Sequence, residues 1–317
     1  MQDSRIARRA VQVASVVTLF ASLAPALVGA QVVQAGSPRN APTAGGRDSV
    51  VARDSVATDS AAAPQAAPAP IRLRAPGIFS LRDAALAVGF TAGAVALFPV
   101  DDQVTRWMRA TPQQENGLLK GTMAGAEAGV EVGAQVVSGG LYLAGLVTRN
   151  RTIADMGLHS LAAVLVSSQA TQLLKNSFGR ARPYATGDSV AHDFEWGGGF
   201  KAGTDRRSFP SGHTSHAFAF ATAMSHEINR AWPRAGKVAS PLLYAGATAA
   251  GVARIYHDKH WASDVVLGAG VGVLSARTTL RFLHGRPNNL LDRVLLHTTI
   301  APNPQGGVTA AISLPTP

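Results

Sequence analysis

The sequence predicts an all-α protein: an antiparallel bundle of about six helices that follows a disordered N-terminal tether and ends in a short β-hairpin. Hydrophobic residues make up 46% of the 317 positions and charged residues 15%, so the chain can fill a sizeable core. Segments rich in Ala, Gly, Val and Leu recur after residue 71 and are long enough for helices. Pro or Gly residues in the loops separate several of these segments.

The first thirty residues have the organisation of a secretory signal peptide. Arg5, Arg8 and Arg9 give a positive start, residues 10–27 are nearly all apolar, and Val28-Gly29-Ala30 fits a small-x-small cleavage site. The apolar run is long for a signal peptide, so an uncleaved anchor helix is the alternative. Either alternative predicts that the body of the chain is exported, to the periplasm or the cell envelope.

Residues 31–70 consist mainly of Ala, Pro, Ser, Asp, Thr and Gly, with hardly an aromatic residue among them. Such a composition cannot bury enough apolar surface to offset the entropy lost on ordering, which predicts a flexible linker. We therefore place the helical domain at residues 71–296 and a C-terminal tail at residues 297–317.

The predicted helices have approximate boundaries 81–98, 121–148, 155–175, 214–228, 238–254 and 262–283. In the last of them, a Gly-x-Gly-x-Gly motif at 268–272 permits close contact with a neighbouring helix. In the tail, Pro304-Gln305-Gly306-Gly307 predicts the turn of the β-hairpin.

The formal charge of +10 favours an anionic partner. A basic excess alone does not distinguish nucleic acid from phosphate esters or acidic lipid. The sequence lacks a basic patch interleaved with aromatic residues, the pattern that binds single strands, so we expect no nucleic-acid partner. Cysteine is absent, which excludes disulfides, thiolate metal sites and a cysteine nucleophile.

Two groups of basic and small residues precede predicted helices or end them. The first is Lys175 with Arg182-Pro183. In the second, Pro210-Ser211-Gly212-His213, Ser211 can cap the new helix and Gly212 lets backbone N–H groups approach an oxyanion. Each group alone also fits an ordinary helix end, either a snorkelling lysine or a capped helix start.

The third group is Arg254, His260 and Asp264. His260 and Asp264 are four residues apart, so they lie on one face at the start of a helix. A carboxylate in this position can hold one imidazole nitrogen protonated and leave the other as an electron pair aimed at phosphorus. Arg254 supplies a guanidinium that can bind two phosphate oxygens.

Antiparallel packing would gather the three groups at one end of the bundle. Lys175 ends one helix, His213 precedes the next, Arg254 ends another, and the segment from His260 to Asp264 opens the last. The long connection at 184–209 would cover the same end. The combined set of cations, backbone donors, imidazoles and a carboxylate is the inventory of a phosphoryl-transfer site.

Taken in order, Lys175-x6-Arg182-Pro183, Pro210-Ser211-Gly212-His213 and Arg254-x5-His260-x3-Asp264 resemble the three-part motif of the type 2 phosphatidic acid phosphatase (PAP2) family. Bacterial class A acid phosphatases and vanadium haloperoxidases share this motif. The resemblance covers residues 175–264 directly. One departure is Ala253, where the family usually has serine, which would remove one hydrogen bond to phosphate but none of the catalytic groups.

The resemblance implies a phosphatase without metal or cofactor that acts on phosphomonoesters, lipid phosphates or lipid diphosphates through a phosphohistidine. His260 would be the nucleophile and Asp264 would orient it, while His213 would protonate the leaving oxygen and then activate water. The other members of the motif would bind the phosphate oxygens: Lys175, Arg182, Ser211, Gly212 and Arg254.

Two alternative functions stay open at this point. A vanadate-dependent haloperoxidase would use the same cationic pocket, because vanadate mimics the phosphate transition state. A non-catalytic envelope protein could keep the pocket only to bind an anion or an anionic lipid. The choice between a lipid and a soluble substrate also stays open, as does the oligomeric state.

The relation of the bundle to a membrane is the last prediction. Charged or polar residues interrupt most of the apolar segments, among them Glu127, Glu131, Asp155, His159, Arg277 and Arg281. Six crossings after export would also return all three motifs to the cytoplasm. We therefore favour a periplasmic bundle that lies against a membrane over a multi-span protein.

Overall fold

The computed structural model describes residues 77–131, 133–186, 190–201, 203–286, 289–296, 298–302 and 308–312. The predicted signal segment, 1–30, and the predicted linker, 31–70, lie outside these residues. The limits of the domain and of the tail therefore stay predictions.

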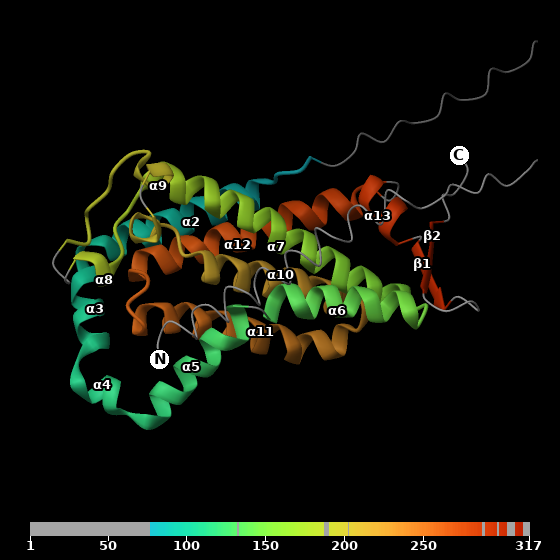
Figure 1. Ribbon diagram of the computed structural model, residues 1–317. Coiled ribbons are helices and arrows are strands. Elements are labelled where there is room, and N and C mark those ends of the chain that lie inside the picture. The colour runs from blue at the N-terminus through green and yellow to red at the C-terminus, as the bar shows by residue number, and fades with distance from the viewer. Residues whose placement is uncertain are drawn as a thin grey trace, which may run out of the picture. The chain divides into compact units, whose positions relative to one another are not determined.

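The described residues form a helical bundle, which confirms the predicted fold class (Figure 1). Its long helices are α2 (Leu81–Leu97), α5 (Gly117–Glu131), α6 (Gly133–Val147), α7 (Arg151–Phe178), α10 (Gly212–Ala231), α11 (Pro233–Tyr256) and α12 (Ala262–His284). One boundary differs from the prediction, because the segment expected as a single helix at 121–148 forms two helices, α5 and α6.

Shorter elements join the long helices: α3 (Asp101–Arg109), α4 (Thr111–Glu115), α8 (Pro183–Thr186), α9 (Gly198–Lys201), α13 (Leu290–Leu295) and two 3₁₀ turns, η1 (Phe98–Val100) and η2 (Thr204–Arg206). Strands β1 (Thr298–Pro302) and β2 (Val308–Ile312) pair antiparallel, with Thr298 opposite Ile312. The predicted C-terminal hairpin is thus confirmed, although its turn lies outside the described residues.

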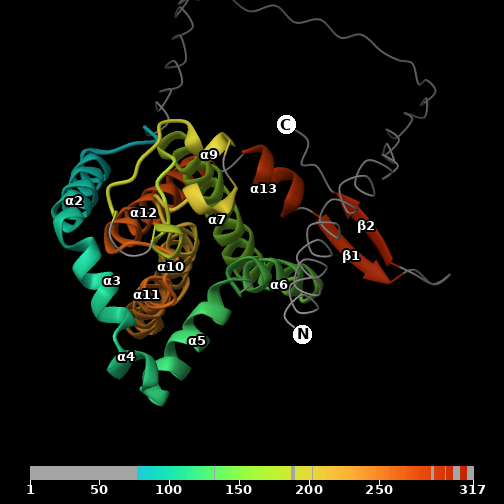
Figure 2. The same ribbon diagram turned by 60° about the vertical axis from the view of Figure 1, so that its left-hand side comes forward.

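Helix α10 lies at the centre of the bundle and packs against α7, α11 and α12 (Figure 2). The predicted close contact along the glycine motif joins α12 to α10. A Cβ atom at Gly268 would lie 2.5 Å from the carbonyl oxygen of Ser211, and one at Gly272 would lie 2.3 Å from that of Ser215. Only glycine fits at these two positions, and the contact brings the starts of α10 and α12 together.

The connection between α7 and α10 folds over one end of the bundle. Helix α7 ends at Gly179, whose φ of 55° is left-handed and suits glycine. The chain then forms a bridge between Arg180 and Phe194 and passes through α8 and α9 before it enters α10. This connection covers the end where α10 and α12 begin (Figure 1), as the sequence predicts.

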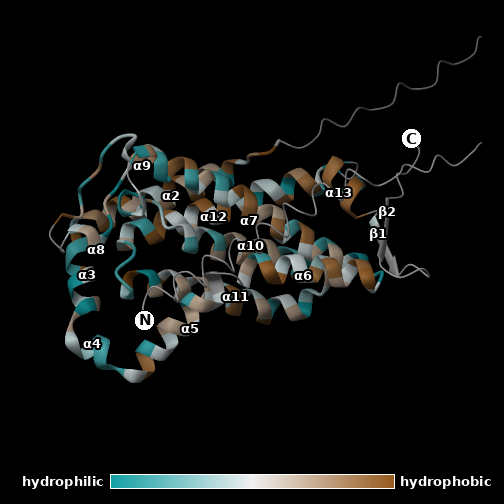
Figure 3. Cartoon of the chain, viewed as in Figure 1, coloured by the Kyte–Doolittle hydropathy of each residue, from teal (hydrophilic) through white to brown (hydrophobic). Residues whose placement is uncertain are grey.

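Within the described part of the chain, three helical segments are long and apolar enough to cross a membrane: Leu81–Arg109, Pro233–Tyr256 and Ala262–His284, with the pair α5 and α6 as a further candidate. In the first of them, only 11% of the most apolar stretch is buried inside the bundle. Figure 3 shows hydrophobic residues spread along the long helices and hydrophilic residues gathered on α3. These features support membrane association of the bundle.

Candidate active site

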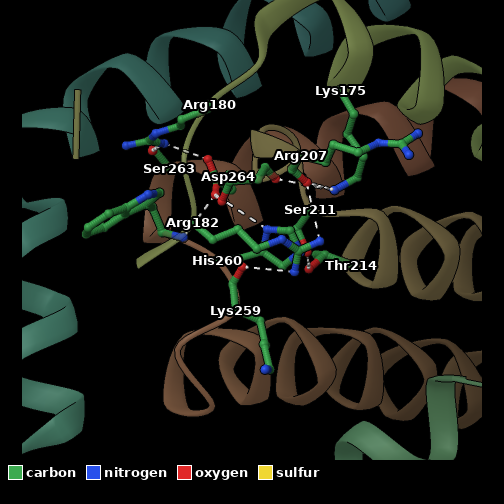
Figure 4. Close-up of polar contacts among 12 residues, drawn as sticks. Lys175, Arg180, Arg182, Arg207, Ser211, Thr214, Lys259, His260, Ser263 and Asp264 are labelled. Carbon is green, nitrogen blue, oxygen red and sulfur yellow. Dashed lines mark hydrogen bonds and ion pairs between the residues drawn. The ribbon is translucent and has the colours of Figure 1, made fainter. Parts of the chain in front are cut away.

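Four helix ends meet at one end of the bundle, which we call the active end (Figure 4). They are the last turns of α7 and α11 and the first turns of α10 and α12. Lys175, Arg254, His260 and Asp264 come from these ends or the adjoining loop, and they are buried, with exposed fractions of 8%, 6%, 1% and 0%. Antiparallel packing therefore brings distant parts of the sequence together, as predicted.

His260 lies in the loop between α11 and α12 and directs one ring nitrogen toward Asp264. The distance between His260 Nδ1 and Asp264 Oδ2 is 3.5 Å, slightly longer than a hydrogen bond. Burial, followed by the positive charge of Lys175, holds the pKa of His260 well below its usual value, so the ring is neutral near neutral pH. A neutral ring in this orientation can present the electron pair of Nε2 to an electrophile.

Three other groups hold the carboxylate of Asp264. Its Oδ1 accepts a hydrogen bond from Nη1 of Arg180 at 2.5 Å. Its Oδ2 accepts hydrogen bonds from the backbone N–H of Trp261, at 3.0 Å, and from the hydroxyl of Ser208. These hydrogen bonds fix the orientation of the carboxylate independently of its contact with the imidazole of His260.

Arg180 is the main residue of the site that sequence reasoning missed. Its side chain is fully enclosed, and it donates to Asp101 at 2.8 Å and to Ser263 at 2.7 Å as well as to Asp264. Four aromatic rings surround its guanidinium: Phe98, Phe194, Phe209 and Trp261. The arginine just before the Arg-Pro motif is a faint sequence signal, but nothing in the sequence pairs it with Asp101.

Lys175, in the last turn of α7, and Arg182, just after that helix, both donate to carbonyls in the later part of the connection. The Nζ atom of Lys175 donates to the carbonyl of Arg207 at 2.6 Å, and Nε of Arg182 donates to that of Thr204 at 2.9 Å. Lys175 lies outside the segments suited to span a membrane. Burial, followed by the charge of Arg182, lowers the pKa of Lys175 to about 7. Lys175 therefore loses its positive charge as the pH rises through about 7.

Ser211 occupies the N-cap position of α10, but the predicted capping bond from its side chain is absent. The buried hydroxyl instead accepts a hydrogen bond from Thr214 at 2.9 Å. The backbone N–H of Ser211 donates to the carbonyl of Asp264 at 2.9 Å. The serine thus ties the start of α10 to the start of α12 and does not cap its own helix.

Gly212 and His213 complete the start of α10 beside the cations. A Cβ atom at Gly212 would lie 3.4 Å from Cε of Lys175, so the glycine leaves the backbone there accessible. Burial, followed by the charge of Arg254, lowers the pKa of His213 to about 3. Burial likewise lowers the pKa of His216, one turn further along, to about 4. Both rings are neutral until an anion offsets the nearby cations.

Arg254 forms an ion pair with Glu127 of α5. The other carboxylate oxygen of Glu127 lies 2.5 Å from Nδ1 of His257. Glu127 therefore contacts the guanidinium that the motif assigns to phosphate. Nothing in the sequence pattern indicates this pair, because the two residues are 127 positions apart.

The active end therefore combines buried cations, a glycine at a helix start and a neutral imidazole beside a fixed carboxylate. Such an arrangement suits an anion with several oxygens, which cations and backbone N–H groups can bind together. The carboxylates of this end, Asp101, Asp264 and Glu127, each contact an arginine and do not form a group that could bind a metal.

Comparisons with known proteins agree with this geometry. Residues 157–287 match the family model of the PAP2 superfamily. A stretch of 100 residues, 32% of this chain, is 38% identical to a lipid A 1-phosphatase of Porphyromonas gingivalis. The match spans 18% of that relative's length.

Two solved structures are similar to part of this chain at low sequence identity. One is a transmembrane PAP2 type phosphatidylglycerolphosphate phosphatase of Bacillus subtilis, with 19% identity, a TM-score of 0.47 and coverage of 67% of this chain and 99% of that chain. The other is LpxE of Aquifex aeolicus, with 22% identity, a TM-score of 0.41 and coverage of 57% and 94%. The stretch that matches the PAP2 superfamily model, residues 157–287, includes every predicted site residue from Lys175 to Asp264.

Proposed function

We propose that this chain is a metal-independent phosphatase of lipid phosphates or diphosphates that works through a phosphohistidine on His260. The observation that carries the proposal is the buried pair of His260 and Asp264, beside Lys175 and Arg182. Nδ1 of His260 lies 3.5 Å from Oδ2 of Asp264. A neutral imidazole next to a fixed carboxylate and several cations is the arrangement that in-line attack on phosphorus requires.

In the first step, Nε2 of His260 attacks phosphorus while the bond from phosphorus to the leaving oxygen breaks. Asp264 stabilises the positive ring that forms, because its carboxylate faces Nδ1. The negative oxygens of the transition state are bound by the cations and by backbone N–H groups at the start of α10, through Lys175, Arg182, Ser211, Gly212 and Arg254.

In the second step, His213 activates a water molecule that releases phosphate from the enzyme. His213 must first donate a proton to the leaving oxygen, yet its pKa of about 3 keeps it neutral. A bound phosphate dianion offsets the charge of Arg254 and so raises the pKa of His213. The proposal therefore includes uptake of a proton when phosphate binds.

A lipid substrate is supported by the apolar surface of the bundle. Leu81, Val88 and Val95 on α2 are 87%, 69% and 56% exposed, which is costly in water but not in lipid. The curated relative that matches part of the chain is named for a lipid substrate. A lipid held in the bilayer could deliver its phosphate to the active end without leaving the membrane.

We further propose that the active end faces the periplasm. The start of α2 lies at the opposite end, where Arg281 donates to the carbonyl of Ile78 at 2.8 Å, so α2 carries the chain from that end to the active end. Because the chain has no cysteine, single cysteines at Val50 and Lys201 can be labelled with a membrane-impermeant maleimide in intact cells.

The labelling pattern distinguishes two placements. Label at both positions indicates an exported bundle that lies against the membrane, whereas label at Lys201 alone indicates that α2 crosses it. Protection of Lys201 in intact cells, with labelling after lysis, would contradict a periplasmic active end.

The function itself is tested by substrate profiling of the full chain in detergent and EDTA. We expect hydrolysis of phosphatidate, a lipid A phosphate or a prenyl diphosphate, with a kcat/KM at least about tenfold above that for p-nitrophenyl phosphate. Hydrolysis of small esters alone would argue against a lipid substrate. Binding of phosphate without turnover would indicate an anion-binding protein, and halide oxidation that requires vanadate would indicate a haloperoxidase.

A further inference from the structure

A second cluster of chemically active side chains lies far from the active end. It consists of His159 on α7, Glu227 on α10 and His284 at the end of α12, and we call it the distal histidine cluster. It lies at the end of the bundle near α13 (Figure 1). Along α7, at roughly 1.5 Å per residue, His159 is about 24 Å from Lys175. Neither the motifs nor the proposed reaction uses these residues.

The three side chains converge on one point. Nδ1 of His159 lies 2.8 Å from Oε1 of Glu227, and Nε2 of His284 lies 2.7 Å from the same oxygen. The three potential ligand atoms all lie within 4.8 Å of one another. In a tetrahedral zinc site the ligand atoms are about 3.3 Å apart, since each lies about 2.0–2.1 Å from the metal. Small side-chain movements would therefore open the cluster to the size of such a site.

The outer contacts of His159 resemble those of a metal ligand. Its second ring nitrogen, Nε2, lies 3.3 Å from Oδ1 of Asp292, and Nδ2 of Asn289 donates to the other oxygen of Asp292 at 2.8 Å. A carboxylate that accepts a hydrogen bond from one nitrogen of an imidazole fixes the tautomer and directs the other lone pair. In His159, the nitrogen left free by Asp292 is Nδ1, which lies beside Glu227.

The charges of the cluster also favour a cation. Glu227 and Asp292 are 3% and 8% exposed, and a buried carboxylate attracts positive charge. Arg230 reaches the second oxygen of Glu227 at 3.7 Å, but its side chain is 59% exposed, so solvent weakens this pair. A divalent cation at Oε1 would add a buried partner to Glu227.

A cavity beside His284 could supply a fourth ligand. His284 lines a cavity of about 530 Å³, together with His226 and Ser225. The hydroxyl of Ser225 is buried and has no hydrogen-bond partner among the described residues. A water molecule on the metal could occupy the fourth position and satisfy this hydroxyl.

We propose that the distal histidine cluster binds one divalent transition metal, with zinc as the preferred ion, through His159, Glu227 and His284. The site joins three helices, α7, α10 and α12, and through Asp292 it also holds α13. Its role is structural, because it lies at the opposite end of the bundle from His260. Metal-free phosphoryl transfer and a structural zinc site are thus independent properties of the chain.

The test uses the purified full chain in detergent, with any affinity tag removed. After exposure to Zn²⁺ and dialysis, elemental analysis should find about one zinc per chain, and Tm should rise by a few degrees relative to protein treated with a chelator. Co²⁺ in place of zinc should give the visible absorption of a tetrahedral site. Zinc below about a tenth of an equivalent, with no change in Tm, would overturn the proposal.

Three variants locate the site. His284→Ala should lose bound zinc and the rise in Tm, whereas the neighbouring His226→Ala should keep both. If His284→Ala does not fold, Asp292→Asn removes only the outer carboxylate and should weaken zinc binding by about 10–100-fold. Equal zinc affinity in the wild type, His284→Ala and Asp292→Asn would place the metal elsewhere and overturn the assignment.

Discussion

The two ends of the bundle are built from the same helices, but their buried side chains carry an excess of opposite charge. At the active end, the cations Lys175 and Arg182 hydrogen-bond mainly to backbone carbonyls. At the distal end, the carboxylates of Glu227 and Asp292 surround imidazole rings. Each end therefore favours a ligand of the opposite sign: a phosphate at the first and, by our proposal, a metal cation at the second.

Each end also contains a network in which arginines hold buried carboxylates. At the active end, Arg180 lies between Asp101 and Asp264. At the other end, Asp83 accepts hydrogen bonds from Arg277, at 2.7 Å, and from Arg281. The comparison shows two uses of buried charge. Arginine–carboxylate networks hold helices together, whereas the buried charges of the two sites are available to a ligand.

The largest effect is expected from His260→Ala, which should abolish activity at the active end without affecting zinc binding at the distal end. It removes the proposed nucleophile, so turnover of a lipid phosphate or p-nitrophenyl phosphate should fall by about 10⁴-fold or more. Zinc content should not change, because the variant leaves the distal end intact. His226→Ala is the matched histidine control, and its kcat should stay near that of the wild type. Loss of less than about tenfold in His260→Ala would refute the assignment of the nucleophile.

The second variant tests whether the network of Arg180 with Asp101 and Asp264 supports the fold. Arg180→Ala leaves two buried carboxylates without their partner, so we expect the free energy of unfolding to fall by about 3–5 kcal/mol. Arg206→Ala is the control, since Arg206 pairs with Asp193 at 2.9 Å in a half-exposed position, and it should cost less than about 1 kcal/mol. Thermal unfolding measures both. Equal losses would show that burial of the network adds no stability.

The third test concerns the charge of Lys175. A lysine whose pKa is lowered to about 7 is cationic below that pH and neutral above it. Since the cation binds phosphate, kcat/KM should fall as pH rises through about 7. Lys175→Arg keeps the charge at all these pH values and should move the alkaline limb upward. An unchanged limb in this variant would assign the pH dependence to another group.

A smaller effect is expected from Glu127→Gln. The carboxylate of Glu127 pairs with Arg254 and so competes with phosphate for its guanidinium. Removal of this competition should lower the inhibition constant of inorganic phosphate by about 3–10-fold. Glu115→Gln, at an exposed position on α4, is the control. Weaker inhibition by phosphate in Glu127→Gln would show instead that Glu127 helps to position Arg254.

The fold and the core of the active end could be predicted because both follow from local patterns. Apolar segments of helical length define the bundle, and antiparallel packing then places alternate helix ends together. Lys175, Arg254, His260 and Asp264 all lie at such ends, so their meeting follows from topology. The glycines of α12 add the close approach to α10 that ties Ser211 to Asp264.

The other groups of the two ends depend on helix rotation, which the sequence pattern does not determine. Arg180 meets Asp101 across 79 positions, and Arg254 meets Glu127 across 127. His159, Glu227 and His284 lie on three different helices without a shared motif. The hydrogen bond of the Ser211 side chain was not predictable from the sequence either. The sequence favours a capping bond, but the Ser211 hydroxyl accepts a hydrogen bond from Thr214 instead.

The most direct test of the central claim is to trap the phosphoenzyme. In His213→Ala, attack on an activated phosphate ester should still occur slowly, but hydrolysis of the intermediate should stall. Rapid quenching at alkaline pH and peptide mass spectrometry should then find an acid-labile phosphoryl group on His260. A phosphoryl group on another residue, or steady turnover with no trapped intermediate, would contradict the account.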